Sequence, residues 1–393
     1  MSLKKRVLIL GPFAERGGRE IEAVFIAQSC LERDYDVRII STTYMPVNSL
    51  ILSHISSQYC NSVYSLICAN FKVYFFALFS YLKNICKLQI EAYAASRVVK
   101  KFCNYDYIYY QELSKSIEKS DLVLFLGQIS SLQLEKISTI CTKNQKPFLF
   151  RMTGYLDSNY QVPNYLKNVT AFIHQSENNF SENLLRVNPY YVIIDQAALF
   201  EEKLLAVSIR KKSVKHFLVI GELSEAKGSR ILASLFKKYS LKDETLTFIG
   251  RGNQLEELKK KYSKHKNINF IGQIPNTRMC HYFSQNDCLI IASCSGSNNF
   301  ETGPFVGIEA MAAGKIIMST RVGAMQNRLS NTENDFWFDI ENPNSFKSTF
   351  MQLRNLTDED VYRIATNVRH KYISYYSKDI VSKQYLDLIK LYA

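Results

Sequence analysis

The chain has 393 residues, of which 47% are hydrophobic and 22% are charged. This length and composition allow two buried cores, which excludes large-scale disorder. The formal net charge is +13, from 49 basic and 36 acidic residues, so we expect an anionic partner. Nucleic acid is disfavoured because the sequence holds no helix-turn-helix, zinc-module or aromatic RNA-binding pattern. A phosphate-bearing small molecule and an anionic membrane face remain as expected partners.

The cysteines and the first residues bear on the cellular compartment. Nine cysteines show no CxxC spacing and no metal-type pairing with the six histidines. A reduced cytoplasmic protein is therefore favoured over a disulfide scaffold. The residues from Met1 to Arg6 run directly into an apolar strand, so we expect no secretory peptide.

Short apolar strands alternate with helical stretches along the whole chain. In the first half, a glycine turn and a helix over about 20–33 separate the first two strands. The predicted strands of this half are Val7–Leu10, Asp36–Ser41, Leu122–Leu126, Pro147–Met152 and Ala171–His174. Those of the second half are Phe217–Ile220, Thr245–Ile249, Asn269–Ile271, Asp287–Ala292 and Ile316–Ser319. This alternation predicts an α/β protein with parallel sheets and helices on both faces.

An aromatic stretch, Lys72–Lys83, interrupts the pattern of the first half. It is too short to span a membrane and carries lysine at both ends. A buried helix is the interpretation that we prefer. The alternative is an interfacial surface with lysines over lipid headgroups, which the nearby basic residues support. These are Lys83, Lys87, Arg97, Lys100 and Lys101.

Two carboxylates frame the most informative stretch of the second half. Gly303-Pro304 breaks any helix that includes Glu301, so this side chain is predicted on a loop. The run 306–313 predicts a short helix that Gly314 ends, with Glu309 near its second turn. The two carboxylates and the helix N-terminus are expected to face one crevice. Carboxylates bind hydroxyl groups and a helix N-terminus binds anionic oxygens, so the pattern suits a ligand with both.

This stretch resembles the Glu-x7-Glu region of retaining glycosyltransferase family 4. Pro304 lies three residues after the first Glu, and Ala310-Met311-Ala312 follows the second. Gly17-Gly18 near the start, and Gly221 with Lys227-Gly228 in the middle, extend the likeness over most of the chain. The resemblance implies the GT-B fold, in which two Rossmann-like domains face each other across a cleft.

The resemblance also implies a domain organisation. The basic, polar stretch Ser208–Lys215 is the predicted linker. Residues 1–207 would form an acceptor-binding domain, and 208–372 a nucleotide-sugar-binding domain. Residues 373–393 would form a C-terminal helix that crosses back to the first domain. A helical tail is expected from about Asp358 onward.

Site residues follow from the matching motifs. The implied catalytic residues are Glu301, which would contact the transferred sugar, and Lys227, which would neutralise the leaving diphosphate. Glu309 would bind the ribose hydroxyls. The backbone N–H groups of the first helical residues would hold phosphate. The implied donor-binding set is Gly17, Gly18, Gly221, Lys227, Arg251, Glu301, Phe305, Val306 and Glu309.

The chain departs from the family pattern at several positions. Glu222 stands where the family has Arg, and a carboxylate there repels phosphate. Either another base substitutes for the arginine, with Arg251 and Arg230 as candidates, or the contact with the diphosphate is weakened. Thr153 occupies the place of a His that reaches the sugar, and Asn327 stands where an acid is frequent.

His174, at the end of a predicted strand, is a further group to place. It is an acceptor-side candidate, although a strand-end histidine is more often structural.

The function implied is retaining, metal-independent transfer of a sugar from a nucleotide-sugar to a glycan or lipid-linked acceptor. No Asp-x-Asp sequence lies within the motifs assigned to the donor, and no cofactor or metal is expected. Surface polysaccharide or lipopolysaccharide synthesis is the expected setting. The protein would be cytoplasmic and peripheral on the inner membrane face. Two alternatives stay open: a degenerate GT-B protein that acts as a scaffold, and a nucleotide-sugar epimerase.

Overall fold

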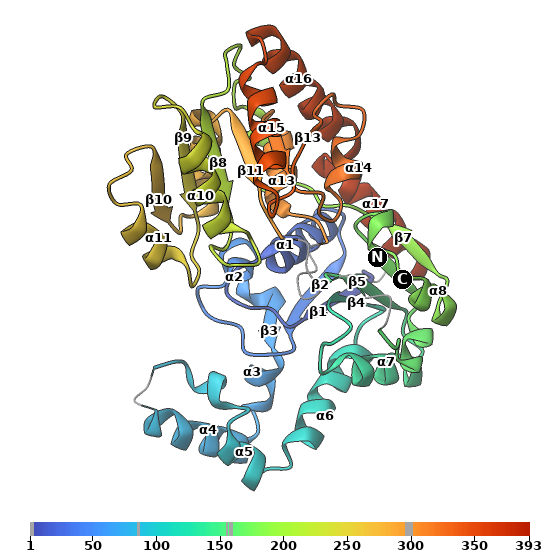
Figure 1. The fold of residues 1–393 in the computed structure, drawn as a ribbon. Coiled ribbons are helices and arrows are strands. Elements are labelled where there is room, and N and C mark those ends of the chain that lie inside the picture. Colours follow the sequence, from blue (N-terminus) through green and yellow to red (C-terminus); the bar gives the residue numbers. More distant parts are fainter. Residues whose placement is uncertain (1–3, 85–86, 155, 157–159, 295–301) are drawn as a thin grey trace. The chain divides into compact units, whose positions relative to one another are not determined.

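The computed structural model describes residues 4–84, 87–154, 156, 160–294 and 302–393 (Figure 1). The chain divides into two compact units. Unit 1 comprises the described residues of Met1–His174, Phe180–Ile194 and Ser382–Ala393. Unit 2 comprises those of Gln175–Asn179 and Asp195–Val381. Each unit has its own parallel sheet, so the predicted α/β class is confirmed.

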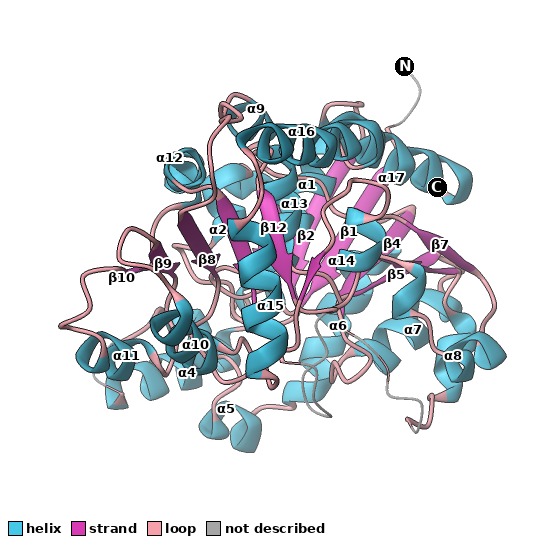
Figure 2. Cartoon of the chain, turned by 45° about the horizontal axis from the view of Figure 1, so that its top comes forward, coloured by secondary structure: helices cyan, strands magenta, loops and turns pink. Residues whose placement is uncertain are grey.

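Unit 1 is built on a seven-stranded sheet in which every neighbouring pair is parallel. Its strands, in spatial order, are β3 (Cys60–Ser62), β2 (Asp36–Ser41), β1 (Arg6–Gly11), β4 (Leu122–Gly127), β5 (Phe148–Met152), β6 (Ala171–His174) and β7 (Tyr191–Ile193). All residues of β4 and β5 are buried, as expected for strands that helices cover on both faces (Figure 2).

The helices of unit 1 vary in length. They are α1 (Gly18–Leu31), α2 (Leu50–His54), α3 (Val63–Ile67), α4 (Phe71–Lys83), α5 (Arg97–Phe102), α6 (Tyr105–Glu118), α7 (Leu134–Lys143) and α8 (Glu182–Val187). Side chains of α3 and α6 pack with those of β4 and β5 in one hydrophobic core, among them Val63, Leu113, Phe125 and Phe150.

Unit 2 has a six-stranded parallel sheet. Its order is β10 (Ile268–Gly272), β9 (Thr245–Ile249), β8 (His216–Ile220), β11 (Cys288–Ile291), β12 (Ile316–Ser319) and β13 (Phe336–Trp337). The strand order reverses between β8 and β11, because β9 and β10 extend on one side and β12 and β13 on the other. In open α/β sheets, ligands bind beyond the carboxyl ends of the strands at such a switch point.

The helices of unit 2 connect these strands and cover the sheet (Figure 2). They are α9 (Glu201–Leu205), α10 (Ser229–Tyr239), α11 (Leu255–Lys261), α12 (Met279–Gln285), α13 (Phe305–Ala312), α14 (Met325–Leu329), α15 (Pro343–Arg354) and α16 (Asp358–Tyr375). Thr357 and Asp360 form a reciprocal capping box at the start of α16, which fixes where this long helix begins.

The chain passes from unit 2 to unit 1 within the last helix, α17 (Lys378–Tyr392), because its residues from Ser382 belong to unit 1. In unit 1 the buried Tyr385 hydroxyl donates to the Glu22 carboxylate of α1 over 2.9 Å. Glu22 in turn pairs with the fully buried Arg151 of β5, 2.6 Å away. A buried charge network therefore anchors the end of the chain to the sheet of unit 1.

The expected linker does not coincide with the division between the units. After the short segment Gln175–Asn179, the chain enters unit 2 again at Asp195 and stays there, whereas the polar stretch 208–215 lies wholly within that unit. Ala198, Leu204 and Val207 pack in the core of unit 2, which explains why the residues before the polar stretch belong there.

The structure also corrects the preferred interpretation of the aromatic stretch. It forms α4, but only Val73, Ala77 and Ser80 of this helix are buried. Phe71, Phe75 and Phe79 are more than half exposed, so the helix is not a buried one. Among the described residues, no helix is long and apolar enough to cross a membrane.

Candidate functional site

Two glycine-containing loops meet at the carboxyl ends of β8 and β9 in unit 2. The N–H of Gly221 donates to the Ile249 carbonyl over 3.0 Å, and the N–H of Leu223 donates to the Arg251 carbonyl over 2.9 Å. Gly250 has φ of 144°, and a Cβ there would lie 1.7 Å from the Gly221 oxygen. Only glycine permits this approach, so Gly250 fixes the two loops against each other.

Lys227 lies where the first of these loops crosses the switch point. Gly228, with φ of 64°, is the left-handed N-cap of α10. A Cβ on Gly228 would lie 2.2 Å from the Ala292 oxygen, beyond the end of β11. The N–H of Cys294 donates to the Ala226 carbonyl over 2.9 Å. The backbone around Lys227 is therefore held against the chain that follows β11, where a ligand of such a sheet is expected.

The bases considered as substitutes at Glu222 differ in their surroundings. Glu222 is exposed, while the neighbouring Leu223 is buried in the core. Arg230 pairs with Glu257 over 2.7 Å at the surface of α10 and α11. Arg251 is exposed on the loop whose backbone contacts Leu223. Of the two arginines, Arg251 is the one on the paired loops.

The third part of the site is the N-terminus of α13. The helix begins at Phe305, and its N-cap residue, Pro304, makes no side-chain hydrogen bond to the first turn. Phe305 and Val306 are in its first turn, where backbone N–H groups lack partners within the helix and suit an anionic ligand. The predicted helix 306–313 is thus found one residue earlier, over 305–312.

Arg328 fixes the turn at the N-terminus of α13. Its side chain is fully buried on α14 and donates to Asp195 through Nε, over 3.0 Å, and through Nη2, over 2.6 Å. Its Nη1 donates to the Pro304 carbonyl over 2.8 Å. A single guanidinium thus joins the start of unit 2 to the turn before α13, so we assign Arg328 a positioning role.

The segment Gln175–Asn179 adds a second support. Asn179 donates through its amide to the Thr302 carbonyl over 3.3 Å. Asn178 donates to the amide oxygen of Asn327 over 2.8 Å. Asn327, in the place of the family's frequent acid, therefore takes part in a contact between α14 and the segment Gln175–Asn179 of unit 2.

Glu309 lies on α13 with only 7% of its surface exposed. Burial raises the pKa of its carboxyl to about 7. Its neighbours come from α9 and from the region where α12 begins, and the crevice between them has no room for a water molecule. The crevice is lined by Phe200, Lys203, Leu204, Asn276, Thr277, Met279, Cys280 and Glu309. Glu301, the expected partner carboxylate, lies outside the described residues.

In unit 1, the glycine pair follows β1 and opens α1. A Cβ on Gly17 would lie 2.7 Å from Oε2 of Glu20, whereas Gly18 faces open space. The other carboxylate oxygen of Glu20 accepts from the Ala14 N–H over 2.7 Å. Arg19 donates to the Pro12 carbonyl over 2.8 Å. The loop before the pair is therefore folded back onto the first turn of α1.

His174 is buried at the end of β6. Burial, and then the positive charge of Arg151, lower the pKa of its imidazole to about 4, so the ring is neutral at pH 7. The ring centroid of Phe180 lies 5.0 Å away, edge to face. Nδ1 of His174 has no hydrogen-bond partner among the described residues. These surroundings match a structural histidine, and the acceptor-side role stays a prediction.

The metal prediction is not tested by the geometry. Among the described residues, no group of three or more His, Cys, Asp or Glu side chains is placed to hold a metal ion. The chain does contain two Asp-x-Asp sequences, 34–36 and 358–360. The first leads into the amino end of β2 and the second begins α16, so neither is at the carboxyl end of a strand.

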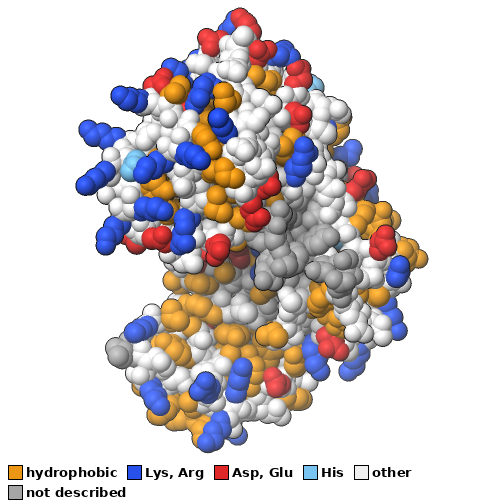
Figure 3. Space-filling view, in the orientation of Figure 1, with side chains coloured by type: hydrophobic (Ala, Val, Ile, Leu, Met, Phe, Trp, Pro, Cys, Tyr) orange, Lys and Arg blue, Asp and Glu red, His pale blue; other side chains and the backbone are white. Residues whose placement is uncertain are grey.

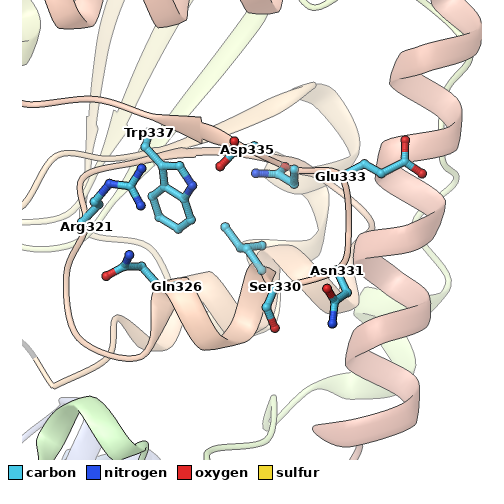
Figure 4. A pocket seen from close by; sticks show the side chains of 9 residues that line it. Arg321, Gln326, Ser330, Asn331, Glu333, Asp335 and Trp337 are labelled. Carbon is cyan, nitrogen blue, oxygen red and sulfur yellow. The ribbon is translucent and has the colours of Figure 1, made fainter.

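A separate cavity of about 300 Å³ lies beside the edge strand β13 of unit 2 (Figure 4). The guanidinium of Arg321 stands 5.1 Å from the ring centroid of Trp337. Glu333, at its rim, pairs with Arg363 and accepts from Asn367. None of the residues predicted for the site lines this cavity, so we treat it as distinct from the switch-point site.

Sequence reasoning missed the Arg328–Asp195 pair. The two residues are 133 positions apart, and neither belongs to a motif. The available signal was that Arg328 follows Asn327, inside a region already matched to the family.

Comparison with known proteins gives a family and a fold. Residues 200–371 match the family model described as glycosyl transferases group 1. The O-antigen biosynthesis glycosyltransferase WbnH of Escherichia coli is 26% identical over 131 residues, which are 32% of this chain and 36% of WbnH. The alignment thus spans about a third of the length of this curated relative.

Solved structures resemble the chain over nearly its whole length. HepE of Anabaena in complex with UDP has a TM-score of 0.69 at 10% identity, covering 98% of this chain and 99% of HepE. In complex with UDP-glucose, the TM-score is 0.66 at 12% identity, with the same coverage. A glycosyltransferase from Rickettsia africae ESF-5 has a TM-score of 0.71 at 15% identity, covering 98% of each chain. The chain therefore has the GT-B fold, as predicted, and its residues 200–371 match the glycosyl transferases group 1 family.

Proposed function

We propose that the protein is a retaining, metal-independent glycosyltransferase that moves a sugar from a nucleotide-sugar to a hydroxyl group. The acceptor would be a glycan or a glycolipid in surface polysaccharide or lipopolysaccharide synthesis at the inner membrane face. The family match of residues 200–371, the O-antigen relative and the UDP-glucose complex of HepE support this proposal.

One observation carries the proposal: two loops that bear basic residues pack together at the switch point of unit 2. The loop with Lys227 packs against the chain that follows β11. The loop with Arg251 is joined to the same loop by backbone hydrogen bonds. Basic side chains and close backbone turns at this place suit a diphosphate, because they neutralise charge and let phosphate approach the backbone.

Each part of the donor then has a proposed partner. Lys227 and Arg251 take the diphosphate, and Arg251 offsets the carboxylate at Glu222. The first-turn N–H groups of Phe305 and Val306 hold phosphate oxygens. By resemblance alone, Glu309 is assigned to the ribose hydroxyls and Glu301 to the transferred sugar. Gly17 and Gly18 are assigned to the donor by resemblance.

The reaction proposed is a front-face substitution at the anomeric carbon. The bond from this carbon to the diphosphate oxygen breaks, and a bond to the acceptor oxygen forms on the same face. The acceptor proton passes to the departing phosphate, so no side chain has to serve as base. Lys227 stabilises the negative charge that develops on the diphosphate.

Nucleotide-sugar turnover without acceptor tests this function. The protein is incubated with UDP-, GDP-, ADP- and CMP-sugars in the presence of EDTA, and the released nucleotide is measured. Slow hydrolysis of one donor is expected, with the anomeric configuration of the first-formed sugar unchanged. Turnover only after addition of Mg²⁺ would contradict metal independence, and an inverted product would contradict retention.

A degenerate scaffold is the second candidate, and Glu222 is the observation that favours it. A carboxylate beside the diphosphate lowers anion affinity. A scaffold would release no nucleotide from any of the four donors. Glu222→Arg then separates the cases, because it should create turnover only where the rest of the site is intact.

A further inference from the structure

Helix α4 of unit 1 turns most of its large aromatic residues away from the core, and Phe76 is the one that packs against it among the described contacts. The buried positions are Val73, Ala77 and Ser80, which recur at helical spacing and are small. The Ser80 and Ser96 hydroxyl groups are hydrogen-bonded over 2.9 Å, and Ser96 lies just before α5. This bond fixes the side of α4 that carries Ser80 toward the interior. Apart from Lys72 and Lys83, the exposed positions of α4 are aromatic or Leu. A soluble helix normally has the opposite arrangement, with its large apolar residues packed on the core.

The outward side forms a continuous apolar strip along α4. Phe71 is 79% exposed, Phe75 and Phe79 are each 54% exposed, and Leu82 is 61% exposed. These positions follow one another at intervals of three or four residues, so they share one side of the helix. Phe102 at the end of α5 is 57% exposed and lies next to them, because its ring stacks on Phe76 at 5.0 Å. We call these five exposed residues the α4–α5 face.

Basic residues surround the α4–α5 face. Between residues 71 and 102 the chain has six basic residues, all exposed, and a single acidic one, Glu91. Three of them are direct neighbours of face residues in sequence: Lys72, Lys83 and Lys101. The ammonium group of Lys101 stands 5.4 Å from the ring centroid of Phe102. Figure 3 shows basic and hydrophobic side chains together where Figure 1 places α4 and α5.

We propose that the α4–α5 face docks this protein on an anionic lipid bilayer. The aromatic rings and Leu82 would enter the interface between headgroups and acyl chains. The lysines keep their charges at the level of the lipid phosphates. Helix α4 has 13 residues, which is too short to span the hydrocarbon core. It therefore lies in the plane of the membrane surface.

Charge complementarity decides between a bilayer and a protein occupant. A self-association interface would oppose the six basic residues of one copy to the same six of another, with one acidic residue to offset them. A bilayer that contains acidic lipids instead neutralises all of them, and its interior accepts exposed aromatic rings without a matching pocket. The surface belongs to unit 1 and uses none of the proposed donor-binding residues of unit 2.

Co-sedimentation with vesicles tests the docking surface. The full chain is mixed with vesicles of phosphatidylcholine alone, or of phosphatidylcholine and phosphatidylglycerol in equal parts. Binding to the anionic vesicles is expected, with weaker binding to the neutral ones and a loss of binding as salt increases. The assay contains no nucleotide-sugar, so its result does not depend on the proposed transferase activity.

Two triple variants divide the apolar from the electrostatic contribution. Phe71→Ser/Phe75→Ser/Phe79→Ser should lower the partition to anionic vesicles at least about tenfold, because the inserted area is lost. Its control, Leu132→Ser/Leu241→Ser/Ile271→Ser, alters apolar residues exposed elsewhere and should bind as wild type does.

The charge variant is Lys72→Gln/Lys83→Gln/Lys101→Gln. It should lose several-fold affinity for anionic vesicles and none for neutral ones. Its control removes three exposed lysines of unit 2 at positions 237, 242 and 264, with the same change in net charge. Equal losses in variant and control would mean that net charge alone, and not this face, binds the membrane.

Other outcomes overturn the proposal. Wild-type protein that leaves anionic vesicles unbound would contradict docking outright. Self-association of the wild type that the Phe→Ser variant abolishes, without vesicle binding, would assign the face to a second copy. Thermal melts check that each variant is folded, and nucleotide binding by the Phe→Ser variant should equal that of wild type.

Discussion

Arg328 donates hydrogen bonds to both carboxylate oxygens of Asp195, with Nε 3.0 Å from Oδ2 and Nη2 2.6 Å from Oδ1. The same guanidinium donates to the Pro304 carbonyl at the start of α13. The pair joins the entry of the chain into unit 2 to the helix whose N-terminus we assign to phosphate. Since both side chains are buried, neither charge has water to replace a lost partner.

Arg328→Met should destabilise the protein by about 3–5 kcal/mol, because it leaves Asp195 buried and unpaired. A thermal or denaturant melt measures the change. Arg363→Met is the matched control. Arg363 is about half exposed and pairs with Glu333 and Asp360, so water screens its charge and its loss should cost much less than that of Arg328. Equal losses in the two variants would show that the buried pair has no special role.

The double variant Arg328→Met/Asp195→Leu separates charge burial from shape. It removes both charges, so it should recover part of the stability that the single variant loses. Nucleotide binding should stay weakened in the double variant, because the hydrogen bond to the Pro304 carbonyl is still absent.

Gly250→Ala should lower both stability and donor binding. The new methyl group would meet the Gly221 oxygen at 1.7 Å, so the two loops must separate. Gly272→Ala is the control for backbone strain alone, because Gly272 has φ of 84° but nothing within 4 Å of its Cβ position. We expect about 1 kcal/mol for Gly272→Ala and a clearly larger loss for Gly250→Ala. Similar melting temperatures would argue against the close packing of the loops.

Glu309 should make stability depend on pH. Its pKa is raised from 4.5 to about 7, so the folded protein holds a proton that the unfolded chain releases between these values. Stability should therefore fall as pH rises from about 4.5 through 7, by an amount of order 3 kcal/mol. Glu309→Gln keeps a neutral group at the site and should flatten this part of the profile. A profile that the substitution leaves unchanged would mean that Glu309 is ionised in the fold throughout.

Arg251→Met should weaken binding of the cognate nucleotide-sugar by about 10-fold or more, since it removes the base that we propose offsets Glu222. Arg230→Met serves as the control because its guanidinium pairs with Glu257 at the surface. Calorimetric titration of the donor into each variant provides the comparison. If Arg230→Met is the more damaging change, the assignment of the substitute base is reversed.

The central strands follow from sequence because they are apolar runs between turn residues. Asp36–Ser41, Thr245–Ile249 and Ile316–Ser319 are found as predicted. Three short strands, β3, β7 and β13, were not predicted. They have two or three residues each and lie at sheet edges, where pairing to a neighbour defines a strand more than composition does.

The orientation of α4 could not be read from its sequence. Apolar residues occupy nearly every position between Lys72 and Lys83, so periodicity gives a helix without telling which side is buried. The tertiary contacts decide it, through Ser80 and its bond to Ser96. Ser80 was the sequence signal for the buried side of α4, because it is a polar residue among apolar ones. This signal was weaker than the aromatic content, which favoured a buried helix.

The motifs proposed for the site can be read from the sequence because the residues of each lie close together in the chain. Gly228 and Gly250 mark tight turns. The structure explains both, because a Cβ at either position would lie within 2.2 Å of a backbone oxygen. The supports of the site were not found, because Arg328, Asp195 and Asn179 reach it from distant parts of the chain. Burial of Glu309 was also beyond reach, since its neighbours come from α9 and the α12 region.

Donor binding at the switch point of unit 2 is tested most directly by thermal shift. Wild-type protein and Lys227→Met are melted with UDP-, GDP-, ADP- and CMP-sugars in EDTA. A ligand at about 100 times its dissociation constant adds close to 3 kcal/mol, so a bound donor raises the melting temperature visibly. We predict a rise with one nucleotide class in the wild type and a much smaller rise in Lys227→Met. No rise with any donor, or an equal rise in both proteins, would contradict the site.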